Sequence, residues 1–294
     1  MKELVHDIAS QLRDVYDADE SMALAWWVVE EVSGLTRTQI LSGCKSDCKD
    51  TTIIPNVQEI VARLRRFEPI QYIFGHTEWC GLDLKVTPDV LIPRPETAEL
   101  VEIISRSSPA NPACRVLDLC TGSGCIAIAL KKRHPDWQVT GVDISPAAIE
   151  VAKENAVRNG VDVEFLVMDI TSDEFEAYYA QIAANVPPPD IIVSNPPYVC
   201  ESEKAQMRRN VLDYEPHLAL FVPDEDPVRL YLSLPHIIIR NHNILYPLPT
   251  VFLEVNERYP MRVARLFYSC GFKDIHFFDD SYGKPRFIQA RGVH

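Results

Sequence analysis

Apolar side chains recur every three or four residues along the first part of the chain, with polar residues between them. This spacing predicts helices, because residues three and four apart share one helix face. Gly34 and Gly43 separate three such segments. Their apolar positions are Leu4, Ile8, Leu12 and Val15, then Leu24, Trp27, Val28 and Val32, then Val57, Ile60, Val61 and Leu64. We therefore predict a small helical domain over residues 1–75, which either docks a partner or caps a larger domain.

The pattern changes between residues 76 and 95. Apolar and polar residues alternate loosely over 77–86, and Gly81 stands where a hairpin needs a turn. The next segment, 90–95, is too rich in proline for a helix. We predict a hairpin linker over 76–95, followed by a second domain over 96–294 that opens with a helix at Pro95 and Glu96.

From residue 113 onward, predicted strands and helices alternate. A helix capped by Ser145, with Pro146 in its first turn, ends at Asn159-Gly160. Such alternation predicts an α/β fold with a mostly parallel, doubly wound sheet and an antiparallel hairpin at its edge. The other predicted helices cover 126–133, 173–184 and 259–269; the strands cover 115–120, 138–143, 163–168, 190–194 and 251–255, and the edge hairpin covers 275–289.

Composition and charge narrow the class of protein. No apolar run approaches the roughly 18 residues that span a bilayer, and the acidic N-terminus lacks the features of a signal peptide. We therefore expect a cytoplasmic protein that makes no membrane contact. The net charge is −13, and both the first 80 residues and the remainder are acidic. Enzymes that bind nucleic acid duplexes usually carry a basic stripe, so the charge disfavours a nucleic acid substrate.

The eight cysteines are better interpreted as reduced thiols than as a disulfide framework, because we expect no signal peptide. Cys44 and Cys48 have the spacing of half a metal site. No second Cys/His pair with ligand spacing follows them, and zinc normally takes four ligands. We expect no metal.

A glycine-rich segment follows the predicted strand 115–120 and opens the next helix. Gly122 and Gly124 in this segment allow a ligand to approach the backbone closely. Asp143 ends the next predicted strand, where a carboxylate can accept hydrogen bonds from both ribose hydroxyls of a nucleoside cofactor. The segment by itself fits S-adenosylmethionine and NAD equally.

Asn195-Pro-Pro-Tyr198 favours S-adenosylmethionine. These residues follow strand 190–194 at its carboxyl end, where open α/β sheets bind ligands. Pro196 and Pro197 stiffen the loop, and Pro196 confines Asn195 to extended conformations. The side-chain carbonyl of Asn195 and the backbone carbonyl of Pro196 can each accept one hydrogen of an NH2 group, while Tyr198 offers a flat face for stacking. Such a loop suits methylation of a planar nitrogen.

An amide nitrogen is a poor nucleophile because its lone pair is delocalised. Holding both of its hydrogens in fixed directions aims the lone pair at the methyl group, and positioning of this kind contributes about 7–11 kcal/mol. No general base is needed before the attack, since the proton leaves after the nitrogen has become positive. An NAD enzyme has no evident use for this loop.

With these motifs together, the chain resembles the release-factor glutamine methyltransferases, the HemK/PrmC family. The resemblance covers almost the whole chain. Asn-Pro-Pro-Tyr is shared with adenine and cytosine methyltransferases, whereas the N-terminal domain and the junction sequence are more specific. The matching segments are Arg65-Arg66, Glu68–Gly75, Ile92–Thr97, the glycine loop, Asp143 and Asn195–Tyr198.

The resemblance implies a class I methyltransferase fold and transfer from S-adenosyl-L-methionine, with S-adenosyl-L-homocysteine as the second product. The acceptor it implies is the glutamine of the Gly-Gly-Gln loop of class 1 peptide-chain release factors, giving N5-methylglutamine. The helical domain would then recognise the release factor, and we expect the enzyme to be a monomer. The site residues implied are Cys120, Thr121, Gly122, Ser123 and Gly124 around the methionine part, Asp143 on the ribose, Asp169 and Ile170 beside adenine, and Asn195, Pro196, Pro197 and Tyr198 around the substrate amide.

The chain departs from the family pattern at several positions. Glycine is usual where Cys120 and Phe67 stand, and an aromatic residue often occupies the position of Ile170. A Gly-Gly turn is usual where residues 242–249 precede the strand at 251. These departures bear on cofactor affinity and on the edge of the sheet more than on reaction type.

Three alternatives remain open from the sequence. The first is an N6-adenine or N4-cytosine methyltransferase acting on DNA or RNA, which needs an extruded base. The second is a module that binds the cofactor without catalysis, and the third is an NAD oxidoreductase. Arg94 and Glu96 either order the cleft or form an ion pair between the domains.

Overall fold

The computed structural model describes residues 1–43, 53–107, 113–185, 188–241 and 247–292. The chain forms two compact units. The smaller unit comprises Met1–Phe74 together with Arg208–Tyr214, and the larger comprises Gly75–Met207 and the chain from Glu215 onward. The sequence analysis placed residues 208–214 in the second domain, whereas the structure groups them with the first.

The smaller unit is helical. Asp17 caps α2 by accepting a hydrogen bond from the Glu20 backbone N–H (2.8 Å), and Gly34 ends α2 with a φ of 64°. Fully buried side chains from α1, α2 and α4 form its core, among them Ile8, Val28 and Leu64. The helices are α1 (Lys2–Leu12), α2 (Ala18–Ser33), α3 (Arg37–Leu41), α4 (Ile53–Leu64), α5 (Ile70–Phe74) and α10 (Arg209–Tyr214).

The larger unit contains a seven-stranded sheet in the order β10-β11-β9-β6-β3-β4-β5. Neighbouring strands from β9 to β5 are parallel, whereas β11 runs antiparallel to both β9 and β10. This arrangement confirms the predicted fold class. The strands are β3 (Arg115–Leu119), β4 (Gln138–Asp143), β5 (Glu164–Val167), β6 (Ile191–Ser194), β9 (Thr250–Glu254), β10 (Phe272–Asp279) and β11 (Pro285–Gly292).

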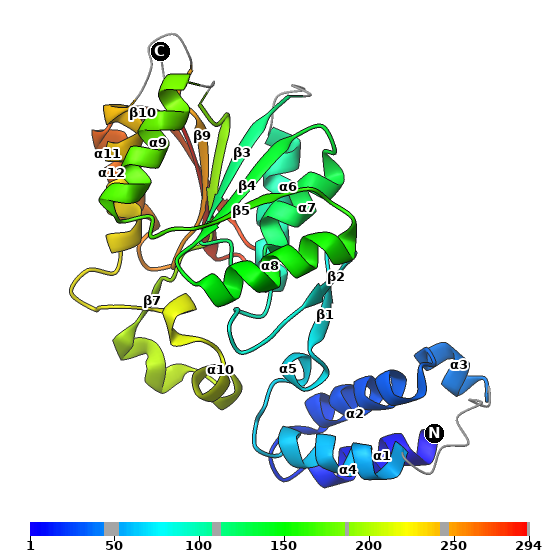
Figure 1. Ribbon diagram of the computed structural model, residues 1–294. Helices are drawn as coiled ribbons and strands as arrows, with labels where there is room; N and C mark the ends of the chain where they lie inside the picture. Colours follow the sequence, from blue (N-terminus) through cyan, green and yellow to red (C-terminus); the bar gives the residue numbers. More distant parts are fainter. Residues whose placement is uncertain (44–52, 108–112, 186–187, 242–246, 293–294) are drawn as a thin grey trace. The chain divides into compact units, whose positions relative to one another are not determined.

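Helices cover both faces of this sheet (Figure 1): α6, α7 and α8 lie on one side and α9, α11 and α12 on the other. Each face of the sheet has its own hydrophobic core. Successive residues of β3 point to opposite faces, so Val116 packs in one core cluster and Leu117 in the other. The helices are α6 (Pro95–Ser107), α7 (Cys125–Arg133), α8 (Pro146–Asn159), α9 (Asp173–Asn185), α11 (Arg229–Arg240) and α12 (Pro260–Ser269).

Shorter elements complete the larger unit. The predicted hairpin linker contains antiparallel β1 (His76–Trp79) and β2 (Leu82–Lys85), joined by Cys80 and Gly81. The chain after the Asn195–Tyr198 loop forms β7 (Val199–Cys200), the 3-10 helices η1 (Glu201–Gln206) and η2 (His217–Ala219), and β8 (Phe221–Val222), which pairs with β7. This pairing brings residues 221–222 beside the strand that directly follows Tyr198.

The strand order places a topological switch between β3 and β6. From β3 the chain proceeds outward to β4 and β5, then crosses back to β6 on the other side of β3. The segments that follow β3 and β6 therefore leave the sheet in opposite directions, which opens a crevice at their carboxyl ends. The glycine loop follows β3 and Asn195 follows β6.

Candidate active site

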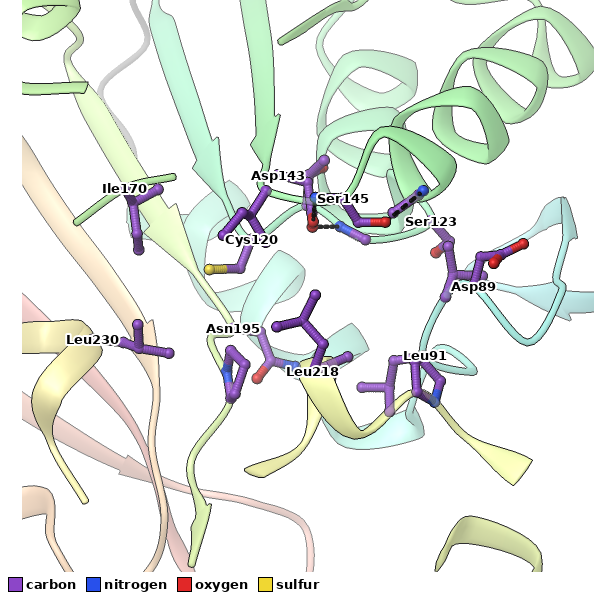
Figure 2. Close-up of a pocket in the computed structure, with 18 of the residues that line it drawn as sticks. Asp89, Leu91, Cys120, Ser123, Asp143, Ser145, Ile170, Asn195, Leu218 and Leu230 are labelled. Atoms are coloured by element: carbon purple, nitrogen blue, oxygen red, sulfur yellow. Dashed lines mark hydrogen bonds between the residues drawn. The ribbon is translucent and has the colours of Figure 1, made fainter. Parts of the chain in front are cut away.

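A pocket of about 400 Å³ lies at this crevice, entirely within the larger unit. That volume is within the usual range for small-molecule sites. Figure 2 shows Cys120, Asp143, Ile170 and Asn195 around the same cavity. The structure brings most of the residues expected from the sequence to its wall: Cys120, Thr121, Gly122, Ser123, Asp143, Asp169, Ile170, Asn195 and Pro197.

Asp118, in β3, holds the loop that follows this strand through hydrogen bonds. Its Oδ2 accepts hydrogen bonds from the Thr121 hydroxyl (2.6 Å) and from the backbone N–H of Ala127 (3.2 Å). The side chain is fully buried, and burial raises the pKa of Asp118 to about 7. Asp118 does not line the pocket, so it acts on the shape of the loop and the start of α7.

The two glycines of the loop have different roles. Gly122 lines the pocket with a φ of 54°, and open space surrounds the position where a Cβ would stand. Gly124 has a φ of 80° and does not line the pocket. A Cβ on Gly124 would come within 3.1–3.2 Å of Ala152, Ile128 and Phe165. Gly124 therefore allows α7 to pack closely, and its contact with the cofactor stays a prediction.

Asp143 joins the glycine loop to the next helix. Its Oδ2 accepts from the backbone N–H of Gly122 (2.8 Å) and its Oδ1 from that of Ser145 (2.9 Å). Burial raises the pKa of Asp143, while these backbone hydrogen bonds oppose the shift. Each oxygen retains acceptor capacity toward the pocket, because a carboxylate has about four acceptor positions.

The far wall of the pocket is largely apolar. Ile144, Met168 and Ile170 line it, and Ile144 is 47% exposed despite its apolar side chain. Asp169 lies beside Ile170, and its Oδ1 accepts from both the backbone N–H and the hydroxyl of Thr171 (2.8 and 2.7 Å).

Asn195 faces this pocket from the end of β6. Its Nδ2 donates to the Thr97 hydroxyl (3.1 Å), and that hydroxyl donates to Oε2 of Glu254 (2.8 Å). The Tyr198 hydroxyl donates to the other oxygen of the same carboxylate (2.9 Å). Pro196 and Tyr198 are not among the residues that line the pocket, although both were expected at the substrate.

Thr97 and Glu254 were not among the site residues predicted from the sequence. Thr97 ends the Ile92–Thr97 junction sequence, and Glu254 follows the apolar residues of β9. Glu254 is 1% exposed. A glutamate at the carboxyl end of a buried strand is a signal that could have identified it, because such residues are almost never fully buried unless paired.

An ion pair lies beside the pocket. Arg94 lines the pocket and contacts Glu215 at 2.6 Å, and Glu215 also accepts from the backbone N–H of Ile92 (3.3 Å). Burial raises the pKa of Glu215, and the guanidinium of Arg94 opposes that shift. Both partners belong to the larger unit, so this pair does not join the two units.

Comparison with known proteins places the chain in a family. Residues 3–75 match the PrmC N-terminal domain, and residues 97–213 match the Methyltransferase small domain. A release factor glutamine methyltransferase from Bacteroides thetaiotaomicron is 40% identical over 293 residues, which cover 99% of either chain. The chain belongs to the release factor glutamine methyltransferases. The family predicted from the sequence motifs is thereby confirmed.

One further relative agrees with this assignment, and one solved structure shares the fold. A release factor glutamine methyltransferase from Flavobacterium psychrophilum is 36% identical, covering 95% of this chain and 94% of the relative. The solved structure of the delta-N METTL16 MTase domain has a TM-score of 0.52 at 14% identity, covering 74% of this chain and 91% of that one. This second likeness concerns the fold alone.

Two further expectations concern metals and membranes. Among the described residues, no three His, Cys, Asp or Glu side chains gather as they would around a metal ion, and Cys44 and Cys48 lie outside those residues. Within the same ranges, every helix is too short or too polar to cross a bilayer.

Proposed function

We propose that this protein transfers a methyl group from S-adenosyl-L-methionine to the side-chain nitrogen of the glutamine in the Gly-Gly-Gln loop of class 1 release factors. The products are N5-methylglutamine and S-adenosyl-L-homocysteine. The observation that carries the proposal is the position of Asn195, which faces the same pocket as Gly122 and Asp143. An acceptor group for an amide and a cradle for a nucleoside thus share one cavity.

The residues present fit S-adenosyl-L-methionine, which supplies an electrophilic methyl group when bound. The backbone of Gly122 leaves room for close approach, since nothing lies within 4 Å of its Cβ position. Asp143 is proposed to accept hydrogen bonds from the ribose hydroxyls. Ile144 and Ile170 offer apolar surface to the adenine, with Asp169 at its edge.

Asn195 and Pro196 are proposed to hold the substrate amide. The Asn195 side-chain carbonyl accepts one amide hydrogen and the Pro196 backbone carbonyl the other, so the nitrogen lone pair is directed at the methyl group. The new N–C bond forms as the C–S bond breaks. The positively charged nitrogen then loses its extra proton to water, and no side chain is required as a base. Stacking of the amide on Tyr198 remains a prediction.

The two units are proposed to divide the work. The helical unit positions the release factor, and the larger unit carries out the transfer. The enzyme is proposed to act as a cytoplasmic monomer, because its substrates are components of translation and the site described above lies within one chain.

The test combines the enzyme with labelled S-adenosyl-L-methionine and purified release factor, and mass spectrometry maps the product. Label is expected on the Gly-Gly-Gln glutamine. Label on DNA or RNA, with none on the release factor, would overturn the proposal. NAD binding measured by calorimetry in place of S-adenosyl-L-homocysteine binding would overturn it as well.

Asn195→Ala is expected to lower kcat by about 100-fold to 1,000-fold, because the amide loses one of its two acceptors. The Kd for S-adenosyl-L-homocysteine, measured by calorimetry, should stay within about threefold of the wild-type value. Asp169→Asn serves as the matched control, since it changes a proposed cofactor contact and should raise the Kd instead. Loss of both activity and binding in Asn195→Ala would contradict the role given to Asn195.

A further inference from the structure

One buried carboxylate contacts Tyr198 at one end of the Asn195–Tyr198 loop directly, and Asn195 at the other end through the Thr97 hydroxyl. Glu254, at the end of β9, accepts from the Tyr198 hydroxyl at Oε1 (2.9 Å) and from the Thr97 hydroxyl at Oε2 (2.8 Å). Thr97 is 2% exposed and connects Glu254 to Asn195. The contacts join α6, β6 and β9, elements that are far apart in the sequence.

These hydrogen bonds have a fixed direction. Thr97 has a single hydroxyl proton, and it donates that proton to Glu254 Oε2 (2.8 Å). The Thr97 oxygen then has only lone pairs left for Asn195, and it accepts from Nδ2 at 3.1 Å. Because the NH2 group of Asn195 is held in this way, the acceptor of its amide, Oδ1, is the atom left for the pocket.

We infer that Thr97 and Glu254 are positioning residues that hold the Asn195 amide with Oδ1 toward the substrate nitrogen. The inference rests on the proposed function, since it concerns the amide acceptor assigned there. The chain of hydrogen bonds from Asn195 through Thr97 to Glu254 is called the relay below. Without it, rotation of the Asn195 amide by half a turn would direct an NH2 group at the substrate NH2. Two donors would then face each other, and the nitrogen would lose its alignment.

The surroundings of Glu254 keep this carboxylate in place. Its backbone carbonyl accepts from the Tyr231 hydroxyl (2.9 Å), and the guanidinium of Arg286 lies near both Glu254 and Tyr198. Burial raises the pKa of Glu254; the hydroxyls of Thr97 and Tyr198 and the charge of Arg286 oppose this, and Glu96 reinforces it. Arg286 is itself held by Asp280 at 3.3 Å.

The test compares two conservative replacements of Thr97. Thr97→Val keeps the shape but removes the hydroxyl, whereas Thr97→Ser keeps the hydroxyl but removes a methyl group. The relay requires kcat to fall by about 10-fold to 100-fold in the valine variant and to remain within about threefold in the serine variant. Thr140→Val is the matched control and should leave kcat unchanged, because the Thr140 hydroxyl donates to exposed Glu164 (3.1 Å).

A purely structural role for Thr97 predicts the reverse order. Valine would then support activity, and serine, which leaves a cavity, would be the weaker variant. That order, or an unchanged kcat in both variants, would overturn the inference. The Kd for S-adenosyl-L-homocysteine, measured by calorimetry, should be similar in all three variants and the wild type.

A measurement without any acceptor substrate separates this inference from the proposed function. In protein labelled with ¹⁵N-asparagine, the Asn195 side-chain NH2 signal is assigned as the one lost in Asn195→Asp. Thr97→Val should shift that signal and speed its hydrogen exchange, and Thr97→Ser should not. An unchanged signal in the valine variant would overturn the relay even if the wild type methylates release factors; a shifted signal would support it even if the acceptor is another molecule.

Discussion

Phe67 in the helical unit and Cys120 in the larger unit share an uncommon backbone conformation. Their φ angles are 68° and 59°, in the left-handed region that favours glycine. Both stand where the family pattern has glycine. A side chain in this region costs about 1–2 kcal/mol. Both units therefore contain one residue with similar backbone strain. They differ in the contacts that the side chain of that residue makes.

Phe67 forms new contacts with its ring. The ring centroid lies 5.6 Å from that of Tyr16, and the guanidinium of Arg209 lies 4.6 Å above the ring. Arg209 belongs to α10, so the phenylalanine helps to fasten that helix within the smaller unit. Here the backbone cost is offset by packing.

Cys120 stands at the wall of the pocket. Burial raises the pKa of its thiol, so the sulfur stays protonated and gains no ionic partner. Directly before this loop, Asp118 is a buried acid whose Oδ1 has no hydrogen-bond partner among the described residues. The larger unit thus concentrates unfavourable features beside its site, as is common where a binding loop must keep a particular shape.

Among substitutions in the two units, Asp118→Asn is expected to have the largest effect on the free energy of unfolding, through its dependence on pH. The folded-state pKa of Asp118, about 7, lies above the usual value for aspartate, so its stabilising contribution is complete at low pH and is lost as pH rises through 7. The wild-type free energy of unfolding should therefore fall between about pH 4 and pH 7, by on the order of 4 kcal/mol from this group. Urea titrations across this range should show a shallower decline in the variant. Parallel declines in both proteins would mean that another group, such as Asp143, is responsible.

Phe67→Ala should have the next largest effect. Alanine keeps the strained backbone and loses the contacts with Tyr16 and Arg209, so the free energy of unfolding should fall by about 2 kcal/mol. Phe67→Gly is the matched control and should recover about 1 kcal/mol, because glycine relieves the strain. Chemical denaturation followed by circular dichroism measures both. A glycine variant more stable than the wild type would show that the ring contacts do not offset the strain.

Cys120→Gly should produce the smallest change, and of the opposite sign. The substitution relieves the strain and removes few contacts, so the free energy of unfolding should rise by about 0.5–1 kcal/mol after the entropic cost of glycine. Urea denaturation without ligand gives this value. A destabilised Cys120→Gly protein would indicate that the thiol supports the loop after β3.

The sequence pattern predicted elements whose information is local. Ser145 and Gly160 flank α8 as the cap residues indicated, and β4 has the predicted bounds, 138–143. Helix α11 was not predicted, and it contains Pro235, a residue that helix interiors disfavour. Hydrophobic burial on one face maintains α11 despite the missing backbone donor, and that burial depends on the tertiary structure.

The candidate site divides in the same way. Gly122 and Asn195 follow β3 and β6, and Asp143 ends β4. Carboxyl ends of parallel strands meet at one edge of a sheet, so the convergence of these residues could be predicted. The contact between Thr97 and Glu254 spans 157 positions in the sequence, and no local sequence pattern predicts it. Gly124 shows that a local motif can also be ambiguous. The glycine-rich motif does not reveal whether a glycine faces a ligand or a neighbouring helix.

The grouping of α10 with the helical unit has a consequence for how the chain is connected. The backbone passes from one unit to the other three times: after Phe74, after Met207 and after Tyr214. The Tyr214 hydroxyl donates to the Arg66 carbonyl (2.9 Å), and Arg208 pairs with Glu20 (3.1 Å), so the inserted segment is held on the smaller unit. Cutting the chain once, at Gly75, would not set the two units free of each other. The smaller unit is in effect an assembly of two separate stretches of chain, and the second stretch begins ten residues after Tyr198, at the end of the loop proposed to bind the substrate amide.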